Sequence, residues 1–118
     1  MPRNMSFSLT TDQVRSRKKT VTRRKGWTFL KRGDVLNACV KCQGLKPGEQ
    51  IERLCQIRVV DVRRERLDCL MVHNYAMAEC ELEGFPEMLG PDFVKMFCSH
   101  MGGKPSQEVT RIAFEYLE

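Results

Sequence analysis

The chain has 118 residues, 42% of them apolar and 30% charged, with a formal net charge of +5. A chain of this length buries roughly 65% of the surface of its unfolded form, so one domain spanning residues 1–118 is predicted, with no need for a metal or disulfide. Its apolar runs are far shorter than the roughly 20 residues of a membrane span, and its first residues lack the apolar core of a signal peptide. We therefore expect a cytoplasmic protein without a membrane partner.

The predicted elements begin with a short strand at 6–9. Thr10, followed three residues later by Gln13, has the pattern of a capping box and predicts a brief helix that ends near Arg17. The β-branched residues from Thr20 onward favour extended chain. The first predicted helix therefore lies between two extended segments.

The longest predicted strand, 51–64, changes phase in its middle. Ile57 and Val59 alternate with polar residues, whereas Val60 and Val62 take the opposite phase, which indicates a β-bulge. Gly90 and the proline after it open a helix. The other predicted elements are strands at 34–42, 67–72 and 108–117, a helix at 90–101 and a loop at 73–75. Short strands with few helices predict an α+β, mainly β fold, a small closed or nearly closed β-barrel.

Positive charge is concentrated at the start of the chain. Residues 1–32 contain ten Lys or Arg and one acidic residue, a net charge of +9, which leaves −4 for the remainder. Such a field attracts polyanions, of which RNA or DNA is the usual candidate. The alternative is a solvated basic surface that only maintains solubility.

The basic segment carries a family resemblance. Together with the motifs that follow it, it resembles the ASCH domain, a relative of the PUA RNA-binding fold. The matching residues are Lys19, Thr20, Thr22 and Arg24, then Gly33-Asp34, the acidic Glu83-Gly84-Phe85, and the terminal segment 109–116. The family motif has Gly where this chain has Arg17, which takes a left-handed conformation only at a cost of about 1 kcal/mol. The resemblance implies a PUA-like β-barrel.

The resemblance also implies a candidate reaction. Some ASCH proteins are amidohydrolases that deacetylate N(4)-acetylcytidine with a Lys, a Thr and a Glu, which here match Lys19, Thr22 and Glu83. A Thr hydroxyl needs a base, and a Lys acts as one only if its pKa falls well below about 10.4. Cations crowd Lys19 and favour such a fall; they are Arg17, Lys18, Arg23 and Arg24.

The geometry of this triad leaves a second interpretation open. In a flat strand Lys19 and Thr22 point to opposite faces, so they converge only if the chain turns between them. Otherwise Lys19 and Arg24 are phosphate contacts, Thr22 is only a strand residue, and Glu83 is a helix-end or solvent residue. The protein is then a non-catalytic RNA-binding module, and RNA cleavage is a further alternative. The predicted nucleic-acid contacts are Arg15, Arg17, Lys18, Arg23, Arg24, Lys25 and Trp27.

Trp27 and the cysteines complete the set of candidates. Trp27 follows the basic cluster, as an aromatic that stacks on a base does, although a core position is an equal alternative. Cys39 and Cys42 form a single CxxC without a second pair, so we expect no metal and no cofactor, and a redox role stays open. The acidic segment 79–87 is an alternative surface for a basic protein partner. The expected partner is RNA or a modified nucleoside; the sequence does not indicate the exact substrate or oligomeric state.

Overall fold

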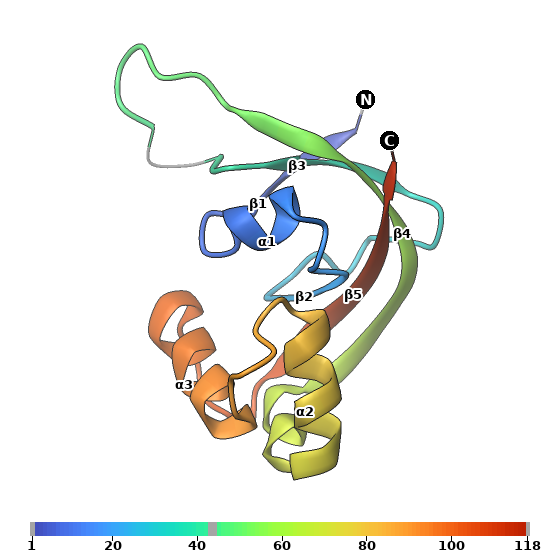
Figure 1. The fold of residues 1–118 in the computed structure, drawn as a ribbon, viewed down its shortest axis with the longest axis vertical. Coiled ribbons are helices and arrows are strands. Elements are labelled where there is room, and N and C mark those ends of the chain that lie inside the picture. Colours follow the sequence, from blue (N-terminus) through green and yellow to red (C-terminus); the bar gives the residue numbers. More distant parts are fainter. Residues whose placement is uncertain (1, 43–44, 118) are drawn as a thin grey trace.

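A computed structural model describes residues 2–42 and 45–117. The five strands are β1 (Arg3–Ser6), β2 (Val21–Arg24), β3 (Val35–Cys39), β4 (Arg53–Arg66) and β5 (Glu108–Leu117). They form one sheet in the order β1-β3-β4-β5-β2, with β1 parallel to β3 and every other pair antiparallel. The sheet curls into a half-barrel whose edges are β1 and β2 (Figure 1). The predicted mainly β, PUA-like α+β fold is confirmed, with the barrel open between these edges.

Four helical segments lie within the described residues. They are α1 (Thr11–Arg15), the 3₁₀ helix η1 (Leu67–Met71), α2 (His73–Leu82) and α3 (Gly90–Met101). The short α1 lies against the half-barrel, whereas α2 and α3 form a separate layer at the end where β4 and β5 reach beyond the other strands (Figure 1). No helix within residues 2–42 and 45–117 is long and apolar enough to cross a bilayer.

The two layers have separate cores. Inside the half-barrel, Phe7 packs against Phe114 with ring centroids 5.9 Å apart. Between η1, α2 and α3, Phe93 and Phe97 pack on the buried residues of η1. β5 contributes Phe114 to the first core and its early residue Val109 to the second. The strand therefore fixes the helical layer relative to the barrel.

The turn after α1 explains the Arg at the family's Gly position. Arg17 has φ 61°, and its N–H donates to the carbonyl of Val14 at 3.0 Å, while the N–H of Lys18 donates to the carbonyl of Gln13 at 3.0 Å. These two bonds are the pattern of a Schellman motif, which normally has Gly at the left-handed position. The left-handed turn is therefore kept, and Arg17 bears its strain.

Several sequence predictions are confirmed and several are wrong. The bulge in β4 lies between Val59 and Asp61, as the phase change predicted, and α3 has the predicted bounds. The predicted capping box is absent, because the Thr10 side chain makes no cap hydrogen bond at the start of α1. The predicted strand at 6–9 is displaced, since β1 ends at Ser6.

The segment 67–75 was predicted incorrectly. It forms η1 and the start of α2 instead of a strand and a loop. Leu67 and Leu70 are both buried, and their spacing of three residues places them on one face of a 3₁₀ helix. The run of apolar residues was therefore helical, which its short length could not reveal.

Candidate functional site

A cavity of about 450 Å³ lies between the half-barrel and the helical layer. The barrel contributes the chain from Ser6 to Thr10, part of β2 and Trp27, and the helical layer contributes Glu83, Phe85 and one face of α3. This volume is within the range of small-molecule sites, which is roughly 300–1,000 Å³. The gap between the two layers is thus large enough for a nucleoside-sized ligand.

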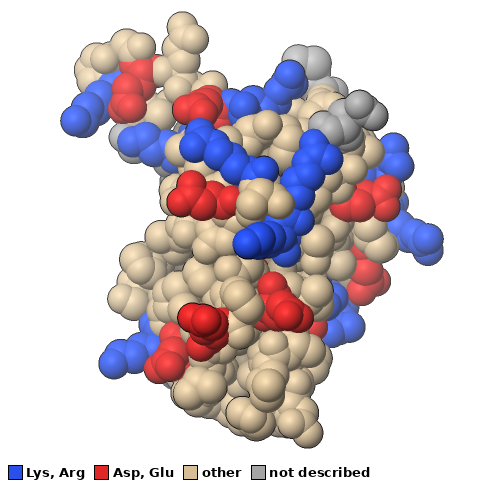
Figure 2. All heavy atoms as spheres, in the orientation of Figure 1, with Lys and Arg blue, Asp and Glu red and all other residues tan. Residues whose placement is uncertain are grey.

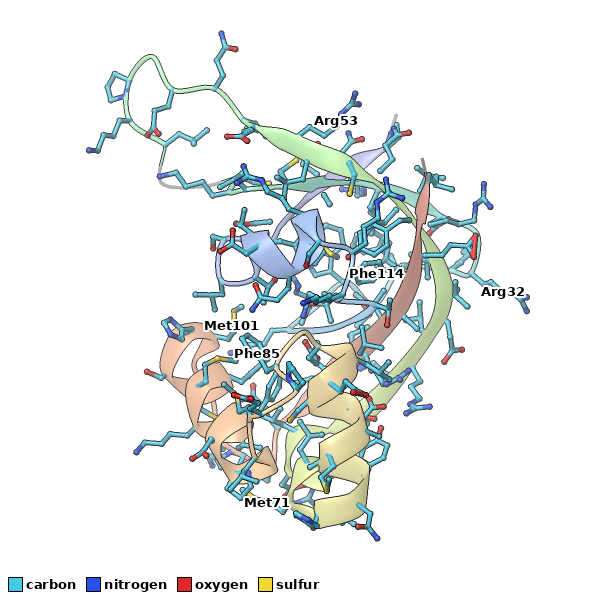
Figure 3. The ribbon with its side chains drawn as sticks, viewed as in Figure 1. Arg32, Arg53, Met71, Phe85, Met101 and Phe114 are labelled. Carbon is cyan, nitrogen blue, oxygen red and sulfur yellow. The ribbon has the colours of Figure 1, made fainter. Side chains whose placement is uncertain are left out.

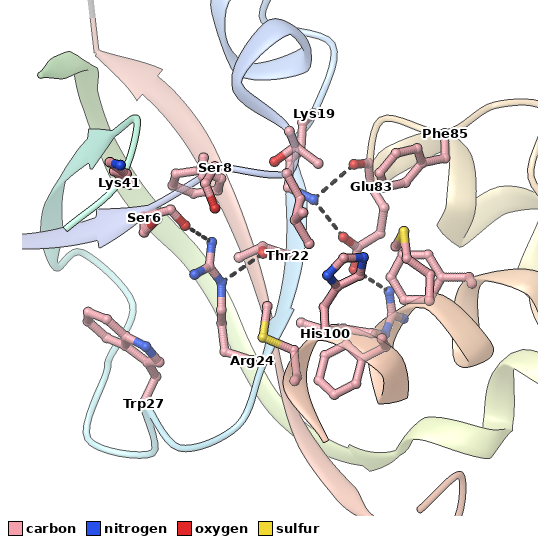
Figure 4. A pocket seen from close by; sticks show the side chains of 18 of the residues that line it. Ser6, Ser8, Lys19, Thr22, Arg24, Trp27, Lys41, Glu83, Phe85 and His100 are labelled. Carbon is pink, nitrogen blue, oxygen red and sulfur yellow. Dashed lines mark hydrogen bonds and ion pairs between the residues drawn. The ribbon is translucent and has the colours of Figure 1, made fainter. Parts of the chain in front are cut away.

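Aromatic and methionine side chains form the apolar walls of the cavity. Trp27 stands on the barrel side, opposite the residues of the helical layer (Figure 4). On the helical side Phe85 meets Phe93 edge to face, with ring centroids 6.2 Å apart. The remaining lining residues of α3 are Met96, Phe97, His100 and Met101. Flat apolar surfaces on both sides favour a planar ligand.

At the base of the cavity Lys19 forms a buried ion pair with Glu83. Its Nζ donates to Oε1 of Glu83 at 2.6 Å and to the backbone carbonyl of the same residue at 2.9 Å (Figure 4). Each side chain is 3% exposed. The N–H of Thr20 donates to the carbonyl of Leu82 at 2.8 Å, so the backbone also joins the two segments.

Gly84 permits this close approach. Its φ is +96°, and a Cβ placed there would lie 2.7 Å from Cγ of Gln13. A larger residue would both strain the backbone and push the end of α2 away from Lys19. The Glu-Gly pair that the sequence singled out therefore has one residue in the ion pair and one that lets the ion pair form.

Arg23 extends the ion pair into a buried network. Its Nη1 donates to Oε2 of Glu83 at 3.0 Å, its Nη2 to Oε1 of Glu79, and its Nε to Oε2 of Glu65 at 2.9 Å. Arg111 donates from Nε to Oε1 of Glu79 at 2.6 Å. Glu79 and Glu83 are thus internal partners of arginines. The predicted alternative that the acidic segment binds a basic protein is not supported for these two residues.

Charge in the site is positive overall. The three carboxylates of the network, those of Glu65, Glu79 and Glu83, form ion pairs with four cations, which are Lys19, Arg23, Arg63 and Arg111. Arg24 also lines the cavity, and it forms no ion pair with any acidic residue that the structure describes. Its guanidinium is therefore a cation of the cavity lining that no described carboxylate balances. Burial lowers the pKa of Arg24 to about 10.

Arg24 also positions Thr22 and bridges the two sheet edges. Its Nε donates to Oγ1 of Thr22 at 3.1 Å, and its Nη2 donates to the carbonyl of Ser6 at 2.6 Å (Figure 4). The guanidinium lies 4.8 Å from the ring centroid of Phe7. A side chain of β2 thus reaches the end of β1 where no backbone pairing joins these described strands.

Lys19, Thr22 and Glu83 all line the cavity. β2 begins at Val21, so Lys19 precedes the strand, and the alternation that would separate Lys19 from Thr22 does not apply. Their described hydrogen bonds differ, however, because Lys19 bonds to Glu83 and Thr22 bonds to Arg24. The three residues share one cavity without forming one hydrogen-bond chain.

Burial lowers the pKa of Lys19 below its usual 10.5, and Glu83 opposes this shift. Arg24 and Arg23 lower the pKa further. The direction agrees with the sequence expectation, although burial is a larger cause than the crowding by cations. A lysine whose neutral form is favoured in this way is suited to accept a proton.

The predicted nucleic-acid contacts occupy different places. Arg23, Arg24 and Trp27 line the cavity, although Arg23 is fully engaged with carboxylates. Arg15 and Arg17 line a second, smaller recess. The two remaining residues, Lys18 and Lys25, are exposed and do not line the cavity. Figure 2 shows that on the face carrying α1 the basic side chains gather over the barrel half of the molecule.

Sequence reasoning missed the cavity lining that α3 supplies. The spacing of its apolar residues predicted a buried face, but the face that includes Phe97 and His100 borders a cavity as well as a core. Periodicity distinguishes a buried face from an exposed one and cannot identify a cavity wall. Of the lining residues that were not predicted, Phe85 had the clearest sequence signal, because it directly follows Glu83-Gly84 in the segment that matches the family motif.

The CxxC pair lies near the same cavity. Cys42 lines it, whereas Cys39 is buried, and burial raises the pKa of the Cys39 thiol to about 11. Both are free thiols. Among the described residues no three His, Cys, Asp or Glu side chains are grouped as metal ligands. The neutral thiol of Cys39 is the form of a packing residue and not that of a nucleophile.

Comparisons with known proteins agree with this fold. No protein-family model and no curated protein sequence matches the chain. Protein EF3133 of the DUF984 family from Enterococcus faecalis has a TM-score of 0.64 and 16% identity, with coverage of 99% of this chain and 80% of that one. The hypothetical protein PH0355 has a TM-score of 0.65 and 16% identity, with 99% and 100% coverage.

An ASCH domain is also among the similar structures. The ASCH domain from Lactobacillus crispatus has a TM-score of 0.55 and 12% identity, with coverage of 97% of this chain and 78% of that chain. The chain therefore has an ASCH-like fold, in agreement with the resemblance that its sequence motifs carry.

Proposed function

We propose that the cavity binds a modified pyrimidine nucleoside, free or within RNA, and hydrolyses an exocyclic amide of the N(4)-acetylcytidine type. One observation carries the proposal: Lys19, Thr22 and Glu83 come from separate parts of the chain and line the same aromatic-walled cavity. The ASCH-like fold supports a nucleoside or RNA ligand only by analogy, because one fold serves many functions.

The aromatic walls of the cavity and the Arg24 guanidinium suit such a ligand. A pyrimidine ring stacks on aromatic side chains, and Trp27 and Phe85 offer these surfaces on the two sides of the cavity. Arg24 donates two hydrogen bonds within the protein, and its Nη1 has no partner among the described residues. This donor is available to a carbonyl oxygen of the base or of the acetyl group.

Lys19 is the general base in this proposal. A neutral lysine amine has two hydrogens and one lone pair, and its two hydrogens are donated to Oε1 and to the backbone carbonyl oxygen of Glu83. The lone pair is then free to accept a proton. Arg23 also binds the Glu83 carboxylate and shares its charge, which weakens the hold of Glu83 on a protonated Lys19.

Thr22 is the nucleophile. Its Oγ1 accepts a hydrogen bond from Arg24, so its own hydrogen is left for the base. Lys19 takes that proton, Oγ1 bonds to the acetyl carbon, and the C–N bond breaks as the exocyclic nitrogen receives the proton through Glu83. Water then cleaves the acetyl ester of Thr22, which releases acetate and regenerates the hydroxyl. The summed reaction converts acetylcytidine and water to cytidine and acetate.

Turnover of N(4)-acetylcytidine tests the proposal. Purified protein incubated with this nucleoside is expected to release cytidine and acetate in equal amounts, measured by chromatography. Thr22→Val removes the hydroxyl at similar volume and is expected to lower the rate at least 100-fold, as is Lys19→Met. Arg32→Ala, which alters an exposed cation that does not line the cavity, is the control and retains activity. An inert wild type at micromolar enzyme, or an active Thr22→Val, contradicts the hydrolase.

The hydrogen bonding of Thr22 favours a second candidate, a binding module without chemistry. Thr22 bonds to Arg24 and not to Lys19, so its hydroxyl has a structural partner in the absence of substrate. This candidate predicts saturable binding of the nucleoside with no product. It is distinguished from the hydrolase in the same assay, since bound acetylcytidine is then recovered unchanged.

A further inference from the structure

A second recess of about 250 Å³ lies beside the end of α1. Arg15 of α1 and Arg17 of the following turn form one side, and Arg53 at the start of β4 forms another. Among the described residues that line the recess, Glu52 is the one with a carboxylate. Three guanidinium groups against one carboxylate give this recess a net charge of +2.

Two of the three arginines have no acidic partner in the part of the chain that the structure describes. Arg15 is paired with Glu52 at 2.7 Å. Arg17 and Arg53 form no ion pair with any acidic residue in the described ranges 2–42 and 45–117, and both are exposed. Like charges around one concavity repel each other, and a bound anion removes that repulsion. The recess is therefore complementary to an anion.

The backbone of Arg17 is a second and independent indication. Its φ of 61° is unfavourable for any residue with a Cβ, and Gly would adopt it without strain. The strained turn carries the Arg17 guanidinium to the recess, where it lies 5.4 Å from the ring centroid of Tyr116. Strain of this kind is concentrated where a side chain has a role. A role in packing alone does not account for an exposed side chain at this position.

The recess adjoins the segment that lines the cavity. Arg17 and Lys19 are two residues apart, so their Cα atoms are separated by about 7 Å at most. The hydroxyl of Tyr116, beneath Arg17, donates to the backbone carbonyl of Lys19. A strand of a few nucleotides is long enough to pass from the cavity to the recess.

We infer that this recess binds a phosphodiester group of an RNA strand whose modified base occupies the cavity. The inference rests on the proposed function and names its substrate class as an oligonucleotide. Guanidinium groups suit phosphate oxygens because their planar fork donates two parallel hydrogen bonds. Arg17 and Arg53 bind the phosphodiester, and Arg15, held by Glu52, adds to the local field. A free nucleoside has no phosphate and gains nothing from the recess.

Binding of matched ligands tests the inference. The probes are N(4)-acetylcytidine itself and a single-stranded hexaribonucleotide with one acetylcytidine in its middle, each titrated at several salt concentrations. Arg17→Gly and Arg53→Ala are each expected to weaken oligonucleotide binding about tenfold and to reduce the slope of log affinity against log salt by about 0.7, the value for one phosphate contact on a single strand. The affinity for the nucleoside is expected to be unchanged.

Arg32→Ala is the matched control, because Arg32 is an exposed cation that lines neither the cavity nor the recess (Figure 3). Arg17→Gly also relieves backbone strain. Its Tm in thermal unfolding is therefore expected to be at least as high as that of Arg53→Ala. An equal loss of affinity in Arg32→Ala, or wild-type affinity in Arg17→Gly and Arg53→Ala, overturns the inference.

Two further outcomes separate related hypotheses. Competition by millimolar inorganic phosphate, with full loss of oligonucleotide binding, would identify a free-phosphate site and overturn the assignment to a strand. Failure of the nucleoside to bind, with oligonucleotide binding that still depends on Arg17 and Arg53, would contradict the proposed function and support the phosphate site.

Discussion

Glu83→Gln tests whether the buried ion pair is essential to the fold of the site. The substitution keeps the shape of the side chain and removes one negative charge from between two cations. Lys19 and Arg23 then share a site in which the Glu83 carboxylate, 3% exposed, no longer balances them. Breaking a buried ion pair on one side costs roughly 3–5 kcal/mol, because the remaining charge is left buried and unpaired.

The lower end of that range applies here. The Lys19 Nζ still has the backbone carbonyl of residue 83 at 2.9 Å, and the Gln amide oxygen still accepts a hydrogen bond. We expect a loss of about 3 kcal/mol. Unfolding of a chain of this length has an entropy of about 250 cal/mol/K, so this loss lowers Tm by about 12 °C. Urea unfolding followed by circular dichroism measures the free energy directly.

Two controls make this prediction refutable. Glu81→Gln alters an exposed carboxylate of α2, two residues before Glu83, and a change within about 0.5 kcal/mol is expected. In the double variant with Lys19→Met, the second substitution removes the unpaired charge, so the combined loss is expected to be smaller than the sum of the single losses. A loss in Glu83→Gln no larger than that in Glu81→Gln, or strict additivity in the double variant, would refute the reasoning.

Three other predictions concern the same site. Burial lowers the pKa of Lys19 below 10.5, so kcat/KM for acetylcytidine is expected to rise with pH and level off below 10.5; a rate that falls over this range contradicts Lys19 as the base. Burial opposes ionisation of Glu79, but hydrogen bonds from Arg111 and Arg23 hold the pKa of Glu79 below 4.5. As pH falls from 4.5, Glu79 therefore binds a proton in the unfolded chain before it does so in the folded one. Below pH 4.5 the free energy of unfolding in urea is expected to fall more steeply with decreasing pH in the wild type than in Glu79→Gln; equal slopes contradict this. Gly84→Ala is expected to lower the free energy of unfolding by about 2–4 kcal/mol, because of left-handed backbone strain and the 2.7 Å approach of a Cβ to Gln13. Gly48 has a similar φ and open space around it, so Gly48→Ala is expected to cost only the strain, about 1 kcal/mol. Similar losses at both positions refute the close approach.

The parts of the fold that could be predicted are those indicated by a sequence pattern within one strand or helix. The alternation of β5 and the phase change in β4 follow from which side of one strand faces a core, and both are present in the sequence. The same holds for α3, whose start has the proline of a first turn. Local patterns of this kind require no knowledge of distant partners.

α2 was missed because its burial depends on distant residues. The buried face of this helix includes Glu79, a residue type that indicates a solvent-exposed face in any sequence pattern. Its carboxylate is buried only because Arg23 of β2 and Arg111 of β5 neutralise it. Ion pairs between segments that lie 32 and 56 residues apart leave no periodic trace in the sequence.

The family motif selected the candidate site residues, but it did not predict their geometry. Lys19 and Glu83, both chosen by their match to the family motifs, line one cavity, but the alternation argument assumed that Lys19 lay within a strand. The start of β2 at Val21 depends on its register with β5, where Val21 pairs with Ala113. The position of a strand boundary is set by this pairing and not by the residues at the boundary alone.

The most direct test of the account is to observe the cavity while a nucleoside binds. Met96 and Met101 line the cavity, whereas the exposed Met71 of η1 and Met77 of α2 are not among its lining residues. Figure 3 shows Met71 far from Met101. In methyl NMR spectra of a Thr22→Val variant titrated with N(4)-acetylcytidine, the signals of Met96 and Met101 are expected to shift saturably while those of Met71 and Met77 stay fixed. Unchanged signals from the two cavity methionines at millimolar nucleoside would contradict the account.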